Sequence, residues 1–238
     1  MWLHKNDVLG ESGVYNLNFL FNEEKFYIMD NHLAAAWCWM QKINPSDKCG
    51  FFHIDRHYDL INNLSTEFIE QNKNCLTGTL SEHLAVTSCL PTVYQAVRFD
   101  NYIELYRKLY PQTLTNYYFV THEDGTCSKE IESYNHRIWD LQDNLSYWII
   151  SNKAQKWILN IDLDYFFQDY EGIKFQFLTD EYVNFICKEI EKSLSKIEVI
   201  TIALSPSFCG GWKPAFRVLK IITDYFKLNF TPEWDLSE

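Results

Sequence analysis

Acidic and imidazole side chains alternate directly after an apolar segment near residue 50. Asp55, His57 and Asp59 occupy every second position after Cys49–Ile54, which is typical of a buried strand. Alternate residues of an extended chain point to the same side, so the three side chains would enter one space. Like charges held this close near a core repel one another and are costly to bury. A bound cation would remove that cost, and the pattern therefore favours a metal site.

A second acidic pair stands far downstream. Asp162 and Asp164 follow the apolar segment Lys156–Ile161 and would also share a face. Each pattern has an ordinary explanation, because polar loops often follow strands and paired aspartates are common at turns and helix starts. An EF-hand is excluded, since neither segment has the required Gly and distant Glu. Two alternating acidic clusters that each close an apolar strand are harder to explain as solvated surface, and together they predict a metal site.

These two motifs resemble the metal signature of the arginase and ureohydrolase superfamily. The segment His53–Leu60, followed downstream by Asp162–Phe166, looks like a branch that includes the peptide arginases, which modify ribosomally made peptides. The resemblance spans most of the chain, from about Tyr27 to about Lys227, and the two acidic motifs are its specific part. It implies an arginase/deacetylase-like fold, an α/β three-layer sandwich with a mainly parallel central sheet.

The resemblance also implies a ligand set for two Mn²⁺ ions in each chain. The six ligands would be His32, Asp55, His57, Asp59, Asp162 and Asp164. Asp55 and Asp162 would bridge the ions, His32 and Asp59 would complete one shell, and the other two residues would complete the second. Carboxylates combined with two imidazoles favour Mn²⁺ or a similar first-row ion over Ca²⁺, which prefers oxygen ligands alone. The alternative for His32 is a helix-start histidine without a ligand role.

The chemistry implied by the resemblance is the hydrolysis of a guanidinium group. Two metal ions about 3.5–4 Å apart can lower the pKa of a shared water towards neutrality. That water would attack the guanidinium carbon, and Asp59 would pass its proton to the leaving amine, so that arginine becomes ornithine and urea is released. His83 lies where the superfamily places a histidine proton shuttle, and its alternative is a capping or core histidine.

The chain departs from the free-arginine arginases after its last expected strand. Those enzymes carry there a Glu that pairs with the guanidinium, whereas Ile202–Pro206 contains no carboxylate. Glu82, Glu123 and Asp124 are possible substitutes. The loop with Gly210 and Gly211 would be flexible enough to admit a peptide, or it is an ordinary connection between a strand and a helix.

Strands and helices alternate along the chain, which predicts a mainly parallel sheet covered on both faces. The expected strands are Phe26–Met29, Cys49–Ile54, Tyr117–Val120, Lys156–Ile161 and Val199–Leu204. The expected helices are His32–Lys42, Asn101–Leu109, Asp180–Lys196 and Pro214–Lys227. We expect Thr179 to cap the third helix. Ligands of such folds bind beyond the carboxyl ends of the strands, where both acidic clusters stand.

Composition limits the remaining possibilities. The 238 residues suit a single domain, 1–238, and carry a formal net charge of −11, which disfavours nucleic acid and would attract a cationic substrate. The seven cysteines form no C-x-x-C pair, and no apolar run is long enough for a membrane span. Met1–Gly13 does not read as a secretory signal. A cytoplasmic protein that binds neither membrane nor nucleic acid is expected.

Three functions remain open from the sequence. The first is a Mn²⁺-dependent peptide arginase whose partner is an arginine-containing precursor peptide. The second is another hydrolase on the same scaffold, such as a deacylase of modified lysine, although the His pair usual in that class is absent. The third is a binding protein with a structural metal. Near the metal ligands, we expect His53 to be a core or supporting residue and Asn160 to orient a ligand carboxylate.

Overall fold

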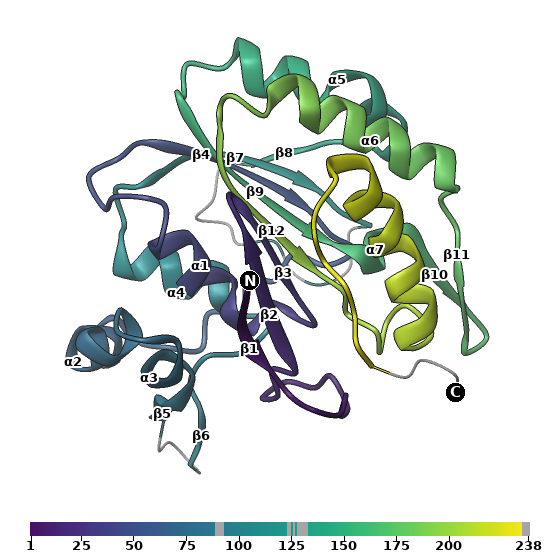
Figure 1. The fold of residues 1–238 in the computed structure, drawn as a ribbon. Helices are drawn as coiled ribbons and strands as arrows, with labels where there is room; N and C mark the ends of the chain where they lie inside the picture. Colours follow the sequence, from purple (N-terminus) through teal and green to yellow (C-terminus); the bar gives the residue numbers. More distant parts are fainter. Residues whose placement is uncertain (89–92, 123–124, 126, 128–132, 235–238) are drawn as a thin grey trace.

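The central sheet determines where the two acidic clusters lie. The computed structural model describes residues 1–88, 93–122, 125, 127 and 133–234 (Figure 1). Within these residues the sheet has eight strands in the order β1-β2-β3-β12-β9-β4-β7-β8. The strands are β1 (Trp2–Lys5), β2 (Phe19–Glu23), β3 (Phe26–Met29), β4 (Cys49–Ile54), β7 (Leu114–Val120), β8 (Ser133–Asn135), β9 (Lys156–Asp162) and β12 (Ile197–Ala203). The run from β3 to β8 is parallel, and β1 and β2 extend it as antiparallel edge strands.

The five strands expected from the sequence are all present. β3 and β4 match their expected bounds at both ends, whereas β7 begins earlier, at Leu114, and β12 is shifted towards Ile197. Every residue of β3 and β4 is buried, as expected for strands of a parallel sheet that is covered on both faces. β4 and β9 pair directly in the middle of the sheet, so the two acidic motifs come from neighbouring strands.

Three helices cover one face of the sheet. They are α5 (Ile138–Ser151), α6 (Asp180–Ser193) and α7 (Trp212–Phe226), and they share a core with Phe52, Leu159 and Ile202 (Figure 1). The hydroxyl of Thr179 accepts the backbone N–H of Tyr182, which confirms the expected N-cap of α6. This helix ends at Ser193, before the expected Lys196.

The opposite face is covered by shorter helices. They are the 3₁₀ turn η1 (His32–Ala34), α1 (Ala35–Met40), α4 (Tyr102–Leu109) and, further out, α2 (Thr66–Leu76) and α3 (Leu80–Ala85). The single helix expected over His32–Lys42 is therefore divided into a 3₁₀ turn and an α-helix. The core on this face includes Phe51 and Ile158, which alternate along their strands with the residues of the other core. The chain is thus an α/β protein with helices on both faces of a mostly parallel sheet.

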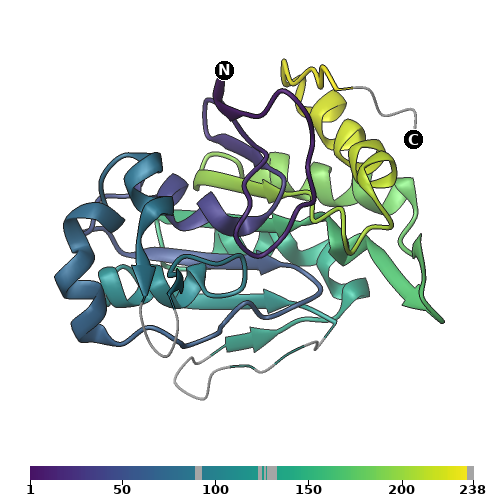
Figure 2. The ribbon, with the colours of Figure 1, turned by 90° about the horizontal axis from the view of Figure 1, so that it is seen from below.

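Smaller elements surround this framework. The 3₁₀ turn η2 (Leu163–Phe166) follows β9 and leads into the hairpin of β10 (Phe167–Tyr170) and β11 (Ile173–Gln176), which projects from the body (Figure 2). A two-stranded ribbon pairs β5 (Thr87–Ser88) with β6 (Tyr94–Gln95). The two ends of the described chain meet, since the rings of Trp2 and Trp234 are 5.5 Å apart. Among the described helices, none has the length and apolar character to cross a membrane.

Candidate metal centre

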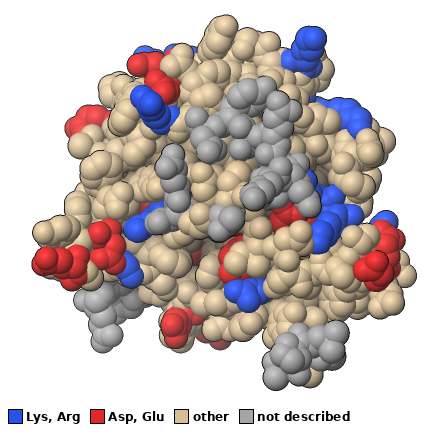
Figure 3. All heavy atoms as spheres, turned by 180° about the vertical axis from the view of Figure 1, so that it is seen from behind, with Lys and Arg blue, Asp and Glu red and all other residues tan. Residues whose placement is uncertain are grey.

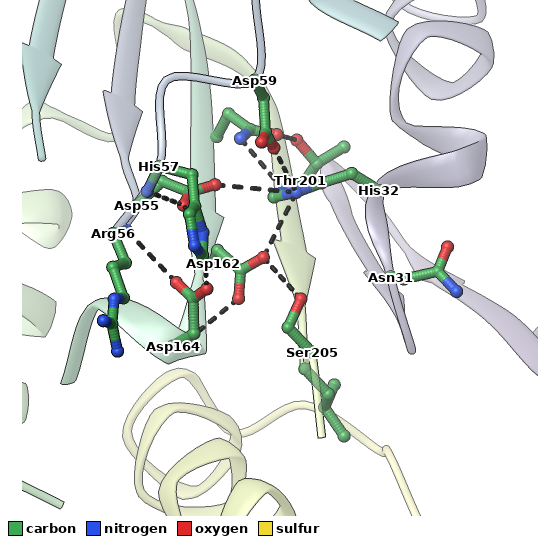
Figure 4. A network of polar contacts seen from close by, with 12 residues as sticks. Asn31, His32, Asp55, Arg56, His57, Asp59, Asp162, Asp164, Thr201 and Ser205 are labelled. Atoms are coloured by element: carbon green, nitrogen blue, oxygen red, sulfur yellow. Dashed lines mark hydrogen bonds and ion pairs between the residues drawn. The ribbon is translucent and has the colours of Figure 1, made fainter. Parts of the chain in front are cut away.

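The site lies where four neighbouring parallel strands end. Ile54 of β4 pairs with Ile161 of β9, and Ala203 of β12 pairs both with Asp162 of β9 and with Met29 of β3. The strands therefore end at the same level, and the residues that follow them meet at one edge of the sheet. Figure 4 shows the six predicted ligands, which are His32, Asp55, His57, Asp59, Asp162 and Asp164, pointing towards one another.

His32 anchors the first half of the site. Its Nδ1 atom lies 3.3 Å from Oδ2 of Asp162, 3.4 Å from Oδ2 of Asp59 and 3.8 Å from Oδ2 of Asp55. One ligand atom from each of His32, Asp55 and Asp59 lies within 4.8 Å of the others. A single divalent cation could contact all of these atoms.

His57 anchors the second half. Its Nδ1 atom lies 3.0 Å from Oδ2 of Asp164 and 3.5 Å from Oδ1 of Asp55. Ligand atoms of Asp55, His57 and Asp164 again lie within 4.8 Å of one another. Asp55 belongs to both halves, so the arrangement is compatible with two ions that share its carboxylate.

Two carboxylate oxygens in the site are buried without a hydrogen-bond partner. They are Oδ2 of Asp55 and Oδ2 of Asp164, and the second of these forms an ion pair with Nδ1 of His57 at 3.0 Å. Buried polar atoms in folded proteins are nearly always paired, because an unpaired one costs free energy. The second oxygen of each carboxylate is held by the backbone, since Oδ1 of Asp55 accepts from the N–H of His57 and Oδ1 of Asp164 accepts from the N–H of Arg56. Each side chain is thus fixed at one oxygen and presents the other to the space between the clusters, as a metal ligand would.

The electrostatics of the site also fit a cation. Burial, together with the negative charges of Asp59, Asp164 and Asp162, raises the pKa of Asp55 well above its usual value. Burial and the charge of Asp164 raise the pKa of Asp162 to about 7. Burial lowers the pKa of His57, but its contacts with Asp164 and Asp55 outweigh this and raise the pKa to about 11. The cluster gathers more negative charge than its histidines balance, and divalent cations would supply the missing positive charge.

A polar network supports His32 from behind. The side-chain nitrogen of Asn160 lies 3.0 Å from each of three atoms, namely Nε2 of His32, Nδ1 of His53 and the hydroxyl of Tyr102. Asn160 therefore contacts the imidazole of a predicted ligand, where the sequence had suggested contact with a ligand carboxylate. An amide nitrogen has only two hydrogens, so it can donate to at most two of these three atoms, and the amide oxygen accepts from the hydroxyl of Thr201 at 2.6 Å.

His53 occupies the supporting position that the sequence suggested. It is fully buried, and its Nε2 atom lies 3.0 Å from the carbonyl oxygen of His57 and 3.6 Å from Oδ2 of Asp55. Burial is the largest of the effects that lower its pKa well below the usual value. A neutral His53 donates through one ring nitrogen to the His57 carbonyl and so holds the turn that carries the first acidic motif.

A cavity of about 480 Å³ opens onto the cluster. The side chains that line it beside the ligands include Tyr58, Leu60, Ile61, Phe99, Asp100 and Phe208. The ring of Phe208 lies 5.0 Å from that of His57, so one wall of the cavity is aromatic and lies directly beside the group of Asp55, His57 and Asp164. Asp100 was not suggested by the sequence, and its carboxylate accepts two hydrogen bonds from Arg98, of 2.9 and 2.7 Å.

The other residues singled out in the sequence lie in different places. His83 is fully buried, and its Nδ1 atom lies 2.6 Å from the carbonyl oxygen of Leu76. His83 does not line the cavity, and its role as a proton shuttle stays a prediction. The carboxylate of Glu82 accepts from Thr79 in a capping box at the start of α3. Glu123 and Asp124 lie outside the described residues. The Gly210–Gly211 loop lines a separate hollow.

The contact between Ser205 and Asp162 was not predicted from the sequence. Ser205 was noted only as the position where a Glu is absent, yet its hydroxyl donates a 2.5 Å hydrogen bond to Oδ2 of Asp162 and it lines the cavity. A serine before a proline signals a turn, but nothing in that pattern indicates a contact with a residue 43 positions away.

Charge on the surface is mixed. On the face shown in Figure 3, the basic side chains of the described residues are scattered among acidic ones. That face therefore lacks, within the described residues, the continuous basic surface typical of nucleic-acid binders. A scan against protein-family models found no match, and neither did a search of curated proteins.

Proposed function

We propose that this chain is a dinuclear-metal hydrolase that converts arginine side chains of a ribosomally made peptide to ornithine and releases urea. The observation that carries the proposal is the position of Asp55, whose carboxylate is shared by two His/Asp groups and has one buried oxygen without a partner. The sequence resemblance to the peptide arginase branch of the arginase and ureohydrolase superfamily supplies the reaction. The mostly parallel sheet, with its ligands at the strand ends, supports an arginase-like fold.

The residues that would hold the ions are those that the sequence suggested. His32, Asp59 and the bridging carboxylates Asp55 and Asp162 would hold one ion, and His57 and Asp164 would complete the site of the other. When bound, two Mn²⁺ ions would lower the pKa of a water and neutralise the carboxylate charge. The chain itself contributes rigid ligands, because backbone N–H groups fix Asp55, Asp162 and Asp164 before any ion binds.

Asp59 is the residue to which we assign proton transfer. Its side chain is the most exposed of the four carboxylates, at 9%, and it lines the cavity. A carboxylate in that position can accept a proton from the attacking water and donate it to the amine that leaves the guanidinium carbon. The electron pair of the broken C–N bond stays on the leaving nitrogen, which becomes the ornithine amine.

The cavity favours an arginine within a peptide over free arginine. Its wall of Leu60, Phe99 and Phe208 suits the methylene groups of an arginine side chain and the apolar neighbours of that residue. Free arginine would bring an ammonium and a carboxylate group, which need polar partners to offset their desolvation. The net charge of −11 would raise the encounter rate of a cationic peptide.

Mass spectrometry of a treated peptide tests the proposal. The Mn²⁺-loaded protein is incubated with an arginine-containing peptide, with the same peptide carrying Lys for Arg, and with free L-arginine at equal concentration. We expect the arginine peptide to lose the mass of urea minus water, urea to appear in the medium, and the other two substrates to remain almost unchanged. Asp55→Asn is the matched inactive control. Loss of an acyl group from an acyl-lysine peptide, or equal turnover of free arginine, would contradict the proposal.

A further inference from the structure

Two residues of the metal centre have a backbone conformation that side chains disfavour. Asp59 has φ 52° and Ser205 has φ 43°, in the left-handed region where the Cβ atom crowds the following carbonyl oxygen. The other described non-glycine residues with positive φ are Glu24, Glu171 and Lys227. These three stand in two hairpin turns and at the C-cap of α7, where left-handed residues are common. Ser205 has no such explanation, because it follows a buried strand.

The contacts of Ser205 show what its conformation achieves. Its backbone N–H donates to the carbonyl of Asp30, at 2.9 Å, and its carbonyl accepts from the N–H of Phe208, at 2.8 Å. The backbone therefore leaves the sheet beside β3 and turns towards the cavity wall within one residue. This turn directs the hydroxyl of Ser205 at Oδ2 of Asp162, at 2.5 Å.

Both oxygens of the Asp162 carboxylate accept hydrogen bonds from described residues. Its Oδ1 atom accepts from the N–H of Asp164, at 3.0 Å, and its Oδ2 atom accepts from Ser205. These two bonds fix the rotation of the carboxylate, so that Oδ2 stays 3.3 Å from Nδ1 of His32. A carboxylate that would bridge two ions needs this restraint most, because a small rotation would break its contact with one of them.

We propose that Ser205 is a positioning residue that sets the orientation of Asp162, and that its left-handed backbone is a strain retained for this purpose. The proposal rests on the metal centre of the proposed function and not on its substrate. Strained backbone conformations persist where the surroundings determine them, and they concentrate at functional sites. Glycine adopts positive φ without that strain, so selection for stability alone would favour glycine at this position.

Two substitutions separate the hydroxyl from the backbone. Ser205→Ala and Ser205→Gly both remove the hydrogen bond to Asp162, and only the second relieves the strain. We expect both variants to bind Mn²⁺ about 10- to 100-fold more weakly than the wild type, as is usual when a residue that supports a metal ligand is lost. In the presence of a chelator, we expect Ser205→Gly to unfold at a temperature about 2–4 °C higher than Ser205→Ala. Isothermal titration with Mn²⁺ and thermal unfolding measure the two effects.

Glu171→Gly is the matched control, since Glu171 has a similar φ of 52° but stands in the turn of the projecting hairpin. It should relieve backbone strain and leave Mn²⁺ affinity unchanged. Wild-type Mn²⁺ affinity in both Ser205 variants would overturn the positioning role, and equal unfolding temperatures of the two variants would overturn the strain. A wild-type protein that binds Mn²⁺ but releases no urea from peptides would refute the proposed function and leave this inference standing.

Discussion

The side-chain amide of Asn160 lies 3.0 Å from Nε2 of His32, the ring atom opposite the one that faces the carboxylates. The same imidazole stacks on the ring of Tyr102, with centroids 4.6 Å apart and planes 20° apart. One neighbour therefore fixes the tilt of the ring and the other fixes its rotation. The orientation of this predicted metal ligand is therefore set by residues outside the predicted ligand set.

Replacing Asn160 with Leu should weaken metal binding without changing any ligand. Leu has a similar size but offers no polar atom, so the ring of His32 loses the polar partner that holds its rotation. We expect about 10- to 100-fold weaker Mn²⁺ binding and a loss of about 1–3 kcal/mol in the free energy of unfolding, because buried polar groups lose their partner. Asn152→Ala is the control, since Asn152 contacts the hydroxyl of Tyr118 far from the ligands and should affect stability alone. Wild-type affinity in Asn160→Leu would contradict this role.

Asp55→Asn should separate metal binding from folding. The Asn oxygen can still accept the 2.6 Å hydrogen bond from the N–H of His57, but the charge that would hold two cations is lost. We expect turnover to disappear and Mn²⁺ stoichiometry to fall, while the chelator-treated variant unfolds at a temperature no lower than the wild type, because repulsion from Asp59, Asp162 and Asp164 is reduced. Metal analysis and thermal unfolding measure the two effects. Near-normal turnover would refute the bridging assignment.

His83 should make the protein less stable in acid. Burial lowers its pKa to about 4 although the Leu76 carbonyl opposes the shift, whereas an unfolded histidine takes up a proton near pH 6.5. Between these values the unfolded chain binds more protons, so the free energy of unfolding decreases as the pH falls from 6.5 to 4, by roughly 3 kcal/mol for this group. Denaturant unfolding at several pH values measures the slope.

The variant His83→Asn distinguishes the two roles suggested for this residue, a buried core histidine and a proton shuttle. An Asn side chain can still donate to the Leu76 carbonyl but does not titrate, so the dependence of stability on pH should be weaker than in the wild type. Because His83 does not line the cavity, we expect turnover to change by less than about tenfold. A loss of turnover by about 10²–10⁴-fold, with stability unchanged, would instead support a role in proton transfer.

Phe208→Ala should weaken substrate binding more than chemistry. The aromatic ring borders the cavity next to His57 and would pack against the substrate without contacting the ions. We expect KM for an arginine-containing peptide to rise by roughly tenfold, as for the loss of a buried apolar contact, with kcat nearly unchanged. Phe185→Ala on α6 removes an equally large side chain that is 51% exposed and should change neither constant. A fall in kcat with unchanged KM would show that Phe208 acts on the reaction itself.

The sequence indicated the positions of the two acidic motifs better than it indicated the elements around them. Asp55 and Asp162 were placed at strand ends because β4 and β9 are mostly apolar segments, and burial of such segments leaves little choice of conformation. The helix α5 was not predicted, although Leu141, Leu145 and Ile149 recur at helical spacing and are buried. Trp139 and Tyr147 are exposed aromatic residues of the same helix, and they obscure the helical spacing of the apolar residues in the sequence.

Contacts between distant segments could not be predicted. The bond from Ser205 to Asp162 depends on a positive φ that no local pattern requires, and the contact of Asn160 with His32 depends on strand order and register. The edge strands β1 and β2 were also missed, since they are short and their pairing is decided by the chain that packs on them. Local propensity sets the elements, and the tertiary arrangement sets these contacts.

The position of β4 beside β9 has a consequence for how the protein assembles. His53 and Asn160 are neighbours in the sheet but are separated by 107 residues of chain. Such distant parallel pairing forms slowly, because a long loop must close before any contact is gained. A growing chain that has not reached Asp162 holds four of the six predicted ligands. Binding of metal by the full set would therefore follow the pairing of β9 with β4 and would stabilise that pairing by mass action.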